Sequence, residues 1–125
     1  MSTIRQVLRN KLIDGVGNIV YNSGIVTKET PKPYIIIRGS NETESNIKVA
    51  YDTYYNIFVY VEKGQHSVMD ELINNVINTL NNTPITLDDG EIFFKYLGFI
   101  GQEYYDIDFD AFGQGLNFKT NKIFE

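Results

Sequence analysis

Cysteine and tryptophan are absent from this sequence, and histidine occurs once, at position 66. Without cysteine there can be no disulfide framework, no thiolate nucleophile and no Cys-ligated zinc or iron–sulfur site. A single His66 also leaves few of the groups that most often act as general bases or metal ligands. The composition therefore disfavours an enzyme.

Basic residues are in the minority, with 11 Lys and Arg against 16 Asp and Glu, for a net charge of −5. An acidic chain repels a phosphate backbone, which disfavours a nucleic-acid reader. Long apolar runs are also missing. Charged residues interrupt the first fifteen positions, where a signal peptide needs an apolar core, and no run approaches the length of a membrane span. We expect a soluble, intracellular protein without a membrane partner.

Apolar residues nevertheless make up 42% of the 125 residues, and they include 9 Tyr and 8 Phe. A chain of this length buries roughly two thirds of its unfolded surface, and this composition can fill such a core. We therefore expect residues 1–125 to form a single domain.

Two segments have the apolar spacing of amphipathic helices. The first is expected to begin at a Thr3 cap paired with Gln6 and to end near Asp14 and Gly15. The second has Ser67 as its expected N-cap and is stopped before Pro84. Acidic residues in its first turn would complement the helix dipole, and its apolar stripe is longer: Asp70 and Glu71, then Met69, Leu72, Ile73, Val76, Ile77 and Leu80.

The remaining periodic segments indicate strands over residues 18–21, 33–38, 47–62, 85–87, 91–100 and 116–124, and residues 104–112 also alternate acidic with apolar side chains. The order is α-β-β-β-α-β-β-β, which predicts a two-layer α+β fold with a mainly antiparallel sheet and two helices. The second helix should lie against the strand at 47–61. Because Tyr54, Phe58 and Tyr60 interrupt the polar face of that strand, a helix or a neighbouring subunit should cover this face.

Three acidic residues, Asp106, Asp108 and Asp110, are spaced two apart, so a strand would place all three carboxylates on one face, where they could collect a hard cation. An exposed strand face explains them equally well, and we favour that reading. Other candidates are weaker still. His66 is expected to be exposed or helix-capping, and the Gly15-Val16-Gly17 sequence lacks the rest of a nucleotide-binding loop. Turn chemistry explains the acidic cluster around Gly90, formed by Asp88, Asp89 and Glu91.

Two features favour contacts with other proteins. Tyrosine is more abundant than one small core requires, and Tyr54 and Tyr60 are candidates for a subunit contact, although ordinary sheet packing is an equal alternative. An apolar-free stretch between two strong strands is expected to be an exposed hairpin loop that docks on a partner: Gly39, Ser40, Asn41, Glu42, Thr43, Glu44, Ser45 and Asn46.

The whole pattern resembles the tail terminator, or tail completion, proteins of tailed bacteriophages, and the resemblance spans nearly all 125 residues. The resemblance rests on the order of the elements: an N-terminal amphipathic helix, a short strand, a long alternating strand and a late aspartate-bearing strand. It also rests on a Pro-aromatic-aliphatic strand and on the second helix: Lys32-Pro33-Tyr34-Ile35-Ile36-Ile37 and Met69-Asp70-Glu71-Leu72-Ile73-Asn74-Asn75-Val76.

The resemblance implies a non-enzymatic virion subunit, assembled in the host bacterial cytoplasm, without cofactor or metal. Such subunits form a homohexameric ring on the tail tube, stop tube polymerisation and dock onto the head connector, and DNA passes through the ring without specific binding. A sheet edge or a long hairpin paired across subunits would close the ring. The alternatives are another neck or minor tail component such as a head-closure protein, a metal-dependent enzyme using Asp106, Asp108 and Asp110, and a small monomeric ligand-binding domain.

Overall fold

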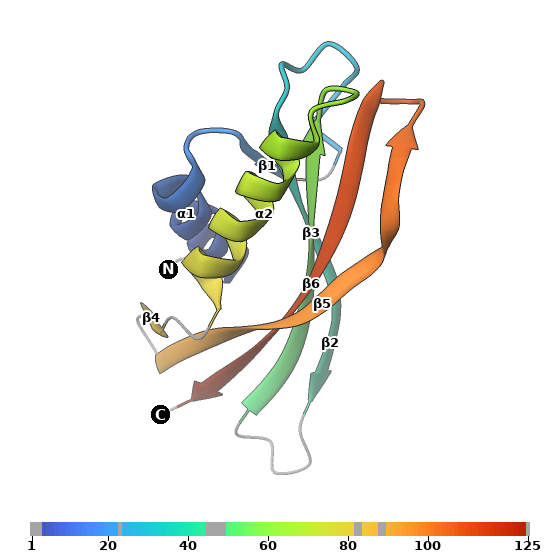
Figure 1. Cartoon of the computed structure of the whole chain (residues 1–125). Helices are drawn as coiled ribbons and strands as arrows, with labels where there is room; N and C mark the ends of the chain where they lie inside the picture. The colour runs from blue at the N-terminus through green and yellow to red at the C-terminus, as the bar shows by residue number, and fades with distance from the viewer. Residues whose placement is uncertain (1–3, 23, 45–49, 82–83, 88–89, 125) are drawn as a thin grey trace.

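Eight elements follow one another along the chain in the computed structural model, which describes residues 4–22, 24–44, 50–81, 84–87 and 90–124 (Figure 1). Their order, α-β-β-β-α-β-β-β, confirms the predicted one. The bounds are α1 Ile4–Val16, β1 Val20–Asn22, β2 Tyr34–Glu44, β3 Ala50–Val61, α2 His66–Leu80, β4 Pro84–Leu87, β5 Gly90–Asp106 and β6 Ala111–Phe124.

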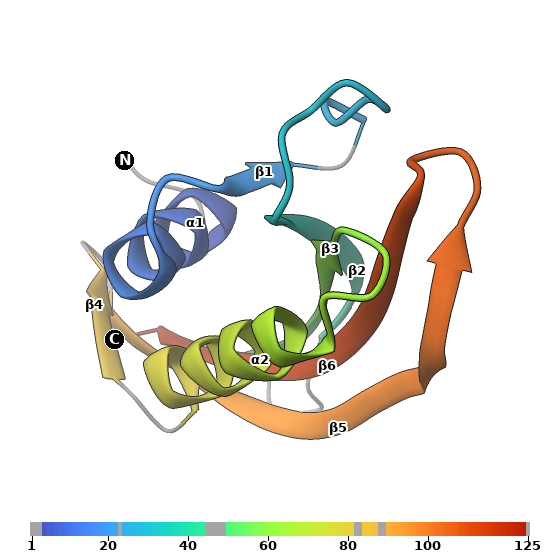
Figure 2. The same cartoon turned by 45° about the horizontal axis from the view of Figure 1, so that its top comes forward.

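The strands form one six-stranded sheet in the order β1-β2-β3-β6-β5-β4. All neighbouring strands pair antiparallel except β1, which runs parallel to β2. The sheet is strongly curled, and both helices lie on the inner side of the curl (Figure 2). The fold is therefore the predicted α+β arrangement, with a helical layer on one face of a mainly antiparallel sheet.

The face of the sheet that carries the helices holds the larger core. Alternate residues of β3, from Tyr55 to Val61, point into it and meet the apolar stripe of α2, as predicted. In α2, the stripe is buried at Met69, Leu72, Ile73, Val76 and Leu80. From α1, Leu8 and Leu12 complete this core.

The opposite face of the sheet carries a second core, rich in tyrosine. Tyr34 and Ile36 of β2 and Phe58 and Tyr60 of β3 are buried there. The predicted cover for this face is present, but its source was predicted wrongly. Among the described residues no helix supplies it, because other parts of the same chain pack against these rings: Val26, Ile100, Tyr104, Phe109 and Ala111.

Two glycines of β6 make room for aromatic rings of β3. A Cβ placed on Gly113 would stand 2.7 Å from Cε1 of Tyr60, and one on Gly115 would stand 2.7 Å from Cε1 of Phe58. Both distances are shorter than carbon atoms tolerate, so these positions must lack a side chain for the rings to pack as they do.

The predicted helix ends were right in one case and wrong in another. Helix α1 ends at Val16, near the predicted Asp14 and Gly15, whereas α2 begins at His66 instead of after Ser67. Gln65 occupies the N-cap position without a side-chain cap bond, and no acidic residue lies in the first turn. The expected Thr3 cap lies outside the described residues. Neither described helix has the length and apolar character needed to cross a membrane.

Candidate interaction surface

One end of the sheet leaves a long strand only partly covered. The outermost strand, β1, has three residues and pairs with Ile35, Ile36 and Ile37 of β2. The rest of β2, residues 38–44, pairs with β3 on its inner side, and no described strand lies on its outer side. We call residues 38–44 the β2 free edge.

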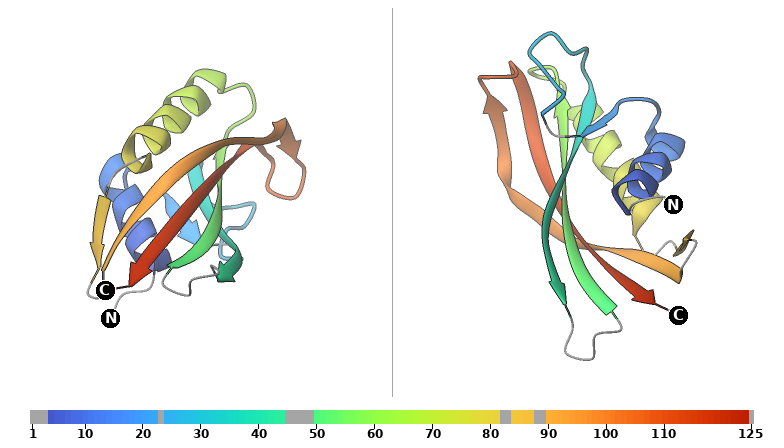
Figure 3. Two further views of the ribbon diagram at one scale, coloured as in Figure 1. Left: turned by 90° about the horizontal axis from the view of Figure 1, so that it is seen from below. Right: turned by 180° about the vertical axis from the view of Figure 1, so that it is seen from behind.

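The other end of the sheet has the same arrangement. The short strand β4 covers residues 90–93 of β5, and the side-chain oxygen of Asn81 accepts a hydrogen bond from the backbone N–H of Tyr96 at 3.1 Å. Beyond that point, residues 97–106 pair with β6 alone within the described chain. Figure 3 shows this upper half of β5 at the outer margin of the sheet. We call residues 97–106 the β5 free edge.

Exposed apolar side chains gather at the β5 free edge. Phe99 is 58% exposed, and Leu97 and Tyr105 are also exposed. Ile107, in the turn that follows, is 78% exposed. A strand edge with unpaired backbone groups and exposed large side chains is a template for another strand. The surface is therefore suited to binding a protein.

The hairpin that joins β5 to β6 contains the three regularly spaced aspartates, and it corrects their predicted arrangement. Residues 107–110 form a turn, so the three carboxylates do not share one face of a strand. An oxygen of Asp106 accepts hydrogen bonds from the backbone N–H groups of Asp108, at 3.0 Å, and Phe109, at 3.3 Å. These bonds are turn chemistry. No group of three His, Asp or Glu residues within the described chain is placed to hold a metal ion.

The last aspartate of the turn is tied to the strand before it. The hydroxyl of Tyr105 donates a hydrogen bond to the carboxylate of Asp110, which holds the pKa of Asp110 below its ordinary value, and the neighbouring Lys32, Lys28 and Lys63 act in the same direction. The same bond raises the pKa of Tyr105. Asp110 has a positive φ of 48°, a conformation that aspartate tolerates in turns.

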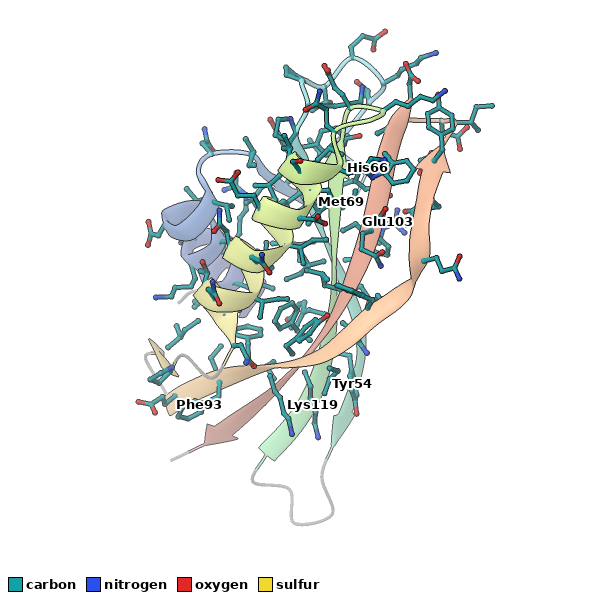
Figure 4. All side chains as sticks on the ribbon, viewed as in Figure 1. Tyr54, His66, Met69, Phe93, Glu103 and Lys119 are labelled. Carbon is teal, nitrogen blue, oxygen red and sulfur yellow. The ribbon has the colours of Figure 1, made fainter. Side chains whose placement is uncertain are left out.

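His66 is exposed, as predicted, and joins the start of α2 to β5 and β6. Its ring packs edge-on against Phe112 with centroids 5.0 Å apart, and its Nδ1 lies 3.6 Å from a carboxylate oxygen of Glu103 (Figure 4). Nearby, the Lys63 ammonium lies over the Tyr105 ring at 5.6 Å. No serine or aspartate completes a catalytic arrangement with His66 in the contacts that the described residues make.

The predicted docking loop is mostly strand. Gly39 to Glu44 belong to β2, and Glu42, Thr43 and Glu44 pair in register with Thr53, Asp52 and Tyr51 of β3. The loop prediction is therefore wrong for these six residues, because pairing with a strong neighbouring strand extends β2 through a polar sequence. Ser45 and Asn46 lie outside the described residues. The proposed contact with a partner stays a prediction.

The two predicted interface tyrosines occupy different environments. Tyr60 is fully buried, with its hydroxyl 2.7 Å from that of Tyr104 and its ring centroid 5.4 Å from that of Tyr34. Burial raises the pKa of Tyr60 far above its ordinary range and that of Tyr34 to about 12. Tyr60 thus follows the alternative of ordinary sheet packing. Tyr54 is half-buried, opposite Lys119 in the β3–β6 register (Figure 4). Its role in a subunit contact stays a prediction.

The sequence contained a signal for the β5 free edge that we did not use. Gly98 and Gly101 have positive φ values, and the register of β5 against β6 shifts at both. These glycines indicated bends or bulges, which the structure confirms, but the predicted strand ended at Ile100, whereas β5 continues through both bulges to Asp106. Leu97 and Phe99, next to these bulges, are the exposed apolar residues.

No family of known proteins matches the sequence, and no curated protein matches it significantly. The fold, however, matches that of solved structures. One of them is a chain described as "Virion of native gene transfer agent (GTA) particle", with a TM-score of 0.74, 12% sequence identity, and alignment over 96% of this chain and 94% of that chain. At this identity the likeness shows a shared fold, and it extends over nearly the full length of both chains.

Proposed function

We propose that this protein is a non-enzymatic structural component of a phage-like virion, and that residues 1–125 act as a single tail-terminator-like unit. The observation that carries the proposal is the shared fold over 96% of the chain with a chain of a gene transfer agent virion, a phage-like particle. The order and polarity of the sequence elements, which resemble tail terminators, support the same conclusion independently.

The geometry of the chain supports an assembly role. Both ends of the sheet have free edges, and the β5 free edge adds exposed Leu97, Phe99 and Tyr105. Two cavities of about 250 and 270 Å³ lie elsewhere and lack a paired base and nucleophile: one is lined by Lys32, Pro33, Val61, Glu62, Gln65 and Val68, the other by Lys11, Asp14, Gly15, Asn78 and Thr79.

In the proposed role, copies of the chain form a homohexameric ring on the head-proximal end of the tail tube. The ring stops addition of tube subunits and docks onto the head connector, and DNA passes through it without being held. The net charge of −5 favours passage, because a basic channel would bind the phosphate backbone. The protein would be found in the neck of the virion.

The test is polymerisation of the tail tube protein of the same virion with and without this chain, followed by negative-stain electron microscopy. We expect six-fold rings of the free protein, and tubes that are shorter and carry a ring at one end. Tubes of unchanged length together with binding to the head connector would indicate a head-closure protein instead. A monomer that affects neither tube nor connector would refute the virion role.

A further inference from the structure

We propose that the β5 free edge of one copy pairs antiparallel with the β2 free edge of a second copy, in a head-to-tail contact that continues the sheet from one subunit into the next. The inference deepens the proposed function, because a ring of identical subunits needs such a contact. Only the closure of the contacts into a ring rests on the proposed function. The pairing of the two edges rests on the geometry of the sheet.

The two ends of the sheet have complementary free edges. Each end of the sheet has an outer strand too short for the strand it covers: β1 covers three residues of β2, and β4 covers four of β5. Along residues 38–44 and 97–106, the backbone groups on the outer side face no described strand, so they must bond to water or to a strand from elsewhere. The two free edges lie at opposite ends of one sheet. The β5 free edge of one copy can therefore pair with the β2 free edge of the next copy.

The direction of the strands favours the same contact. From β2 through β3 and β6 to β5, every pairing is antiparallel, so β5 runs opposite to β2 within one subunit. A neighbouring copy that keeps the same strand directions therefore places its β2 antiparallel to β5. Antiparallel pairing is the more stable of the two arrangements.

The charges along the two edges also favour antiparallel pairing. Lys95 stands just before the β5 free edge, and Glu103 and Asp106 stand towards its end. The β2 free edge has the same order of signs along the chain, with Arg38 first and Glu44 last. An antiparallel alignment brings Arg38 to the acidic end of β5 and Glu44 to the end at Lys95. A parallel alignment would place like charges together, which is unfavourable for cross-strand neighbours.

The contact also determines how far neighbouring copies are displaced from each other along the strand direction. Following the registers across the sheet, Glu44 is level with Ile92 and Arg38 with Gly98, so the β2 free edge lies level with the beginning of β5. The β5 free edge lies beyond it in the strand direction. A neighbour must therefore shift along the strands by about five residues, or roughly 17 Å. A closed ring accommodates this shift only when the strands are tilted relative to the ring axis, as they are in a barrel. The contact uses different surfaces on the two copies and is heterologous.

Two variants block one edge each. Leu97→Asp with Phe99→Asp places charges among the exposed side chains of the β5 free edge. Ser40→Pro removes a backbone donor from the β2 free edge at a position without a partner in β3, because the β2–β3 register shifts between Gly39 and Glu42. The matched control is Ile25→Asp, an apolar side chain that is 61% exposed and outside both edges.

The measurement is size-exclusion chromatography with light scattering, on variants whose melting temperature stays close to that of the unmodified chain. We expect the unmodified chain and Ile25→Asp to assemble, and each blocked variant to be monomeric. Mixed in equal amounts, the two blocked variants should form a heterodimer and nothing larger, because one intact β5 edge then meets one intact β2 edge. This pattern is specific to a head-to-tail contact.

Several results would overturn the inference: a monomeric unmodified chain, blocked variants that assemble normally, or Ser40→Pro forming dimers alone, which would indicate β5 pairing with β5. If Ser40→Pro does not fold, Glu44→Lys serves as the β2 variant. Glu44→Lys and Lys95→Glu should each weaken assembly several-fold, and the double variant should restore it.

The inference and the proposed function can fail separately. Open filaments or dimers that depend on both edges would support the edge pairing and refute the ring. Rings that survive both blocking variants would support the proposed function and refute the edge pairing.

Discussion

Replacing Gly113 by alanine tests how the rings of the second core pack on β6. The added Cβ would stand 2.7 Å from Cε1 and 2.9 Å from Cδ1 of Tyr60, and 3.3 Å from Cζ of Tyr104. Tyr60 cannot move aside easily, because it is fully buried, stacks against Phe58 and is hydrogen-bonded through its hydroxyl to Tyr104. The new methyl group is therefore an overpacking change.

The magnitude follows from two opposing effects. Overpacking a well-packed core costs about 1–3 kcal/mol. Against this, Gly113 lies outside the positive-φ glycines, so alanine there should gain about 0.5–1 kcal/mol by restricting the unfolded chain. We expect a net loss of about 1–2 kcal/mol from a total stability on the order of 5–15 kcal/mol. For a chain of this length, this corresponds to a fall in melting temperature of about 4–8 °C.

The assay is urea denaturation of a double-mutant cycle with Tyr60→Leu, which removes the ring that the new methyl group meets. In the Tyr60→Leu background, Gly113→Ala should be neutral or slightly stabilising. An equal loss of stability in both backgrounds would show that the clash with Tyr60 is not the cause, and that the account of the second core is wrong.

Three further predictions concern the helical core, alkaline pH and DNA. Val76→Asp or Leu72→Asp should unfold the chain, since an unpaired buried carboxylate costs several kcal/mol, on the order of the total stability. Circular dichroism should show the loss of structure, while the control Asn74→Asp, at an exposed position of the same helix, should keep the normal melting temperature. Burial, helped by the charge of Asp106, raises the pKa of Tyr34 to about 12. The unfolded chain therefore loses this proton first, so the urea midpoint should fall between pH 10 and 12, and less steeply in Tyr34→Phe. An equally steep fall in that variant would exclude Tyr34 as the cause. The free protein should not shift the band of duplex DNA in an electrophoretic gel at physiological salt, because an acidic surface offers few phosphate contacts. A band shift at micromolar protein concentration would contradict this prediction.

The helices and the order of elements could be predicted because their signals are local. The apolar stripe of α2 repeats with helical spacing over 12 residues, from Met69 to Leu80, and no other arrangement buries it as well. The alternating residues of β3 likewise identified the inner face of the sheet, from Tyr55 to Val61. In both segments the local pattern and the final packing agree.

The errors occurred where tertiary pairing or turn chemistry outweighs the local pattern. Residues 39–44 contain no apolar residue, yet backbone pairing with β3 keeps them in a strand. Around Asp106, alternation of acidic and apolar residues imitates a strand, whereas the Asp106 side chain bonds to the N–H groups that follow it and makes a turn. The glycines of β5 indicated its bulges, but the sequence could not show that this strand has a free edge, because which strand lies outermost depends on the order of strands across the sheet.

The register shifts in β5 and β2 have a consequence for how selective the sheet edges are. In β5, the register shifts between Tyr96 and Gly98 and again between Ile100 and Tyr104, and in β2 it shifts between Gly39 and Glu42. A regular extended peptide cannot stay in phase with the backbone groups of such an edge over its whole length. The bulges therefore make indiscriminate pairing of these edges with extended peptides less favourable, which is one way in which sheet proteins limit aggregation.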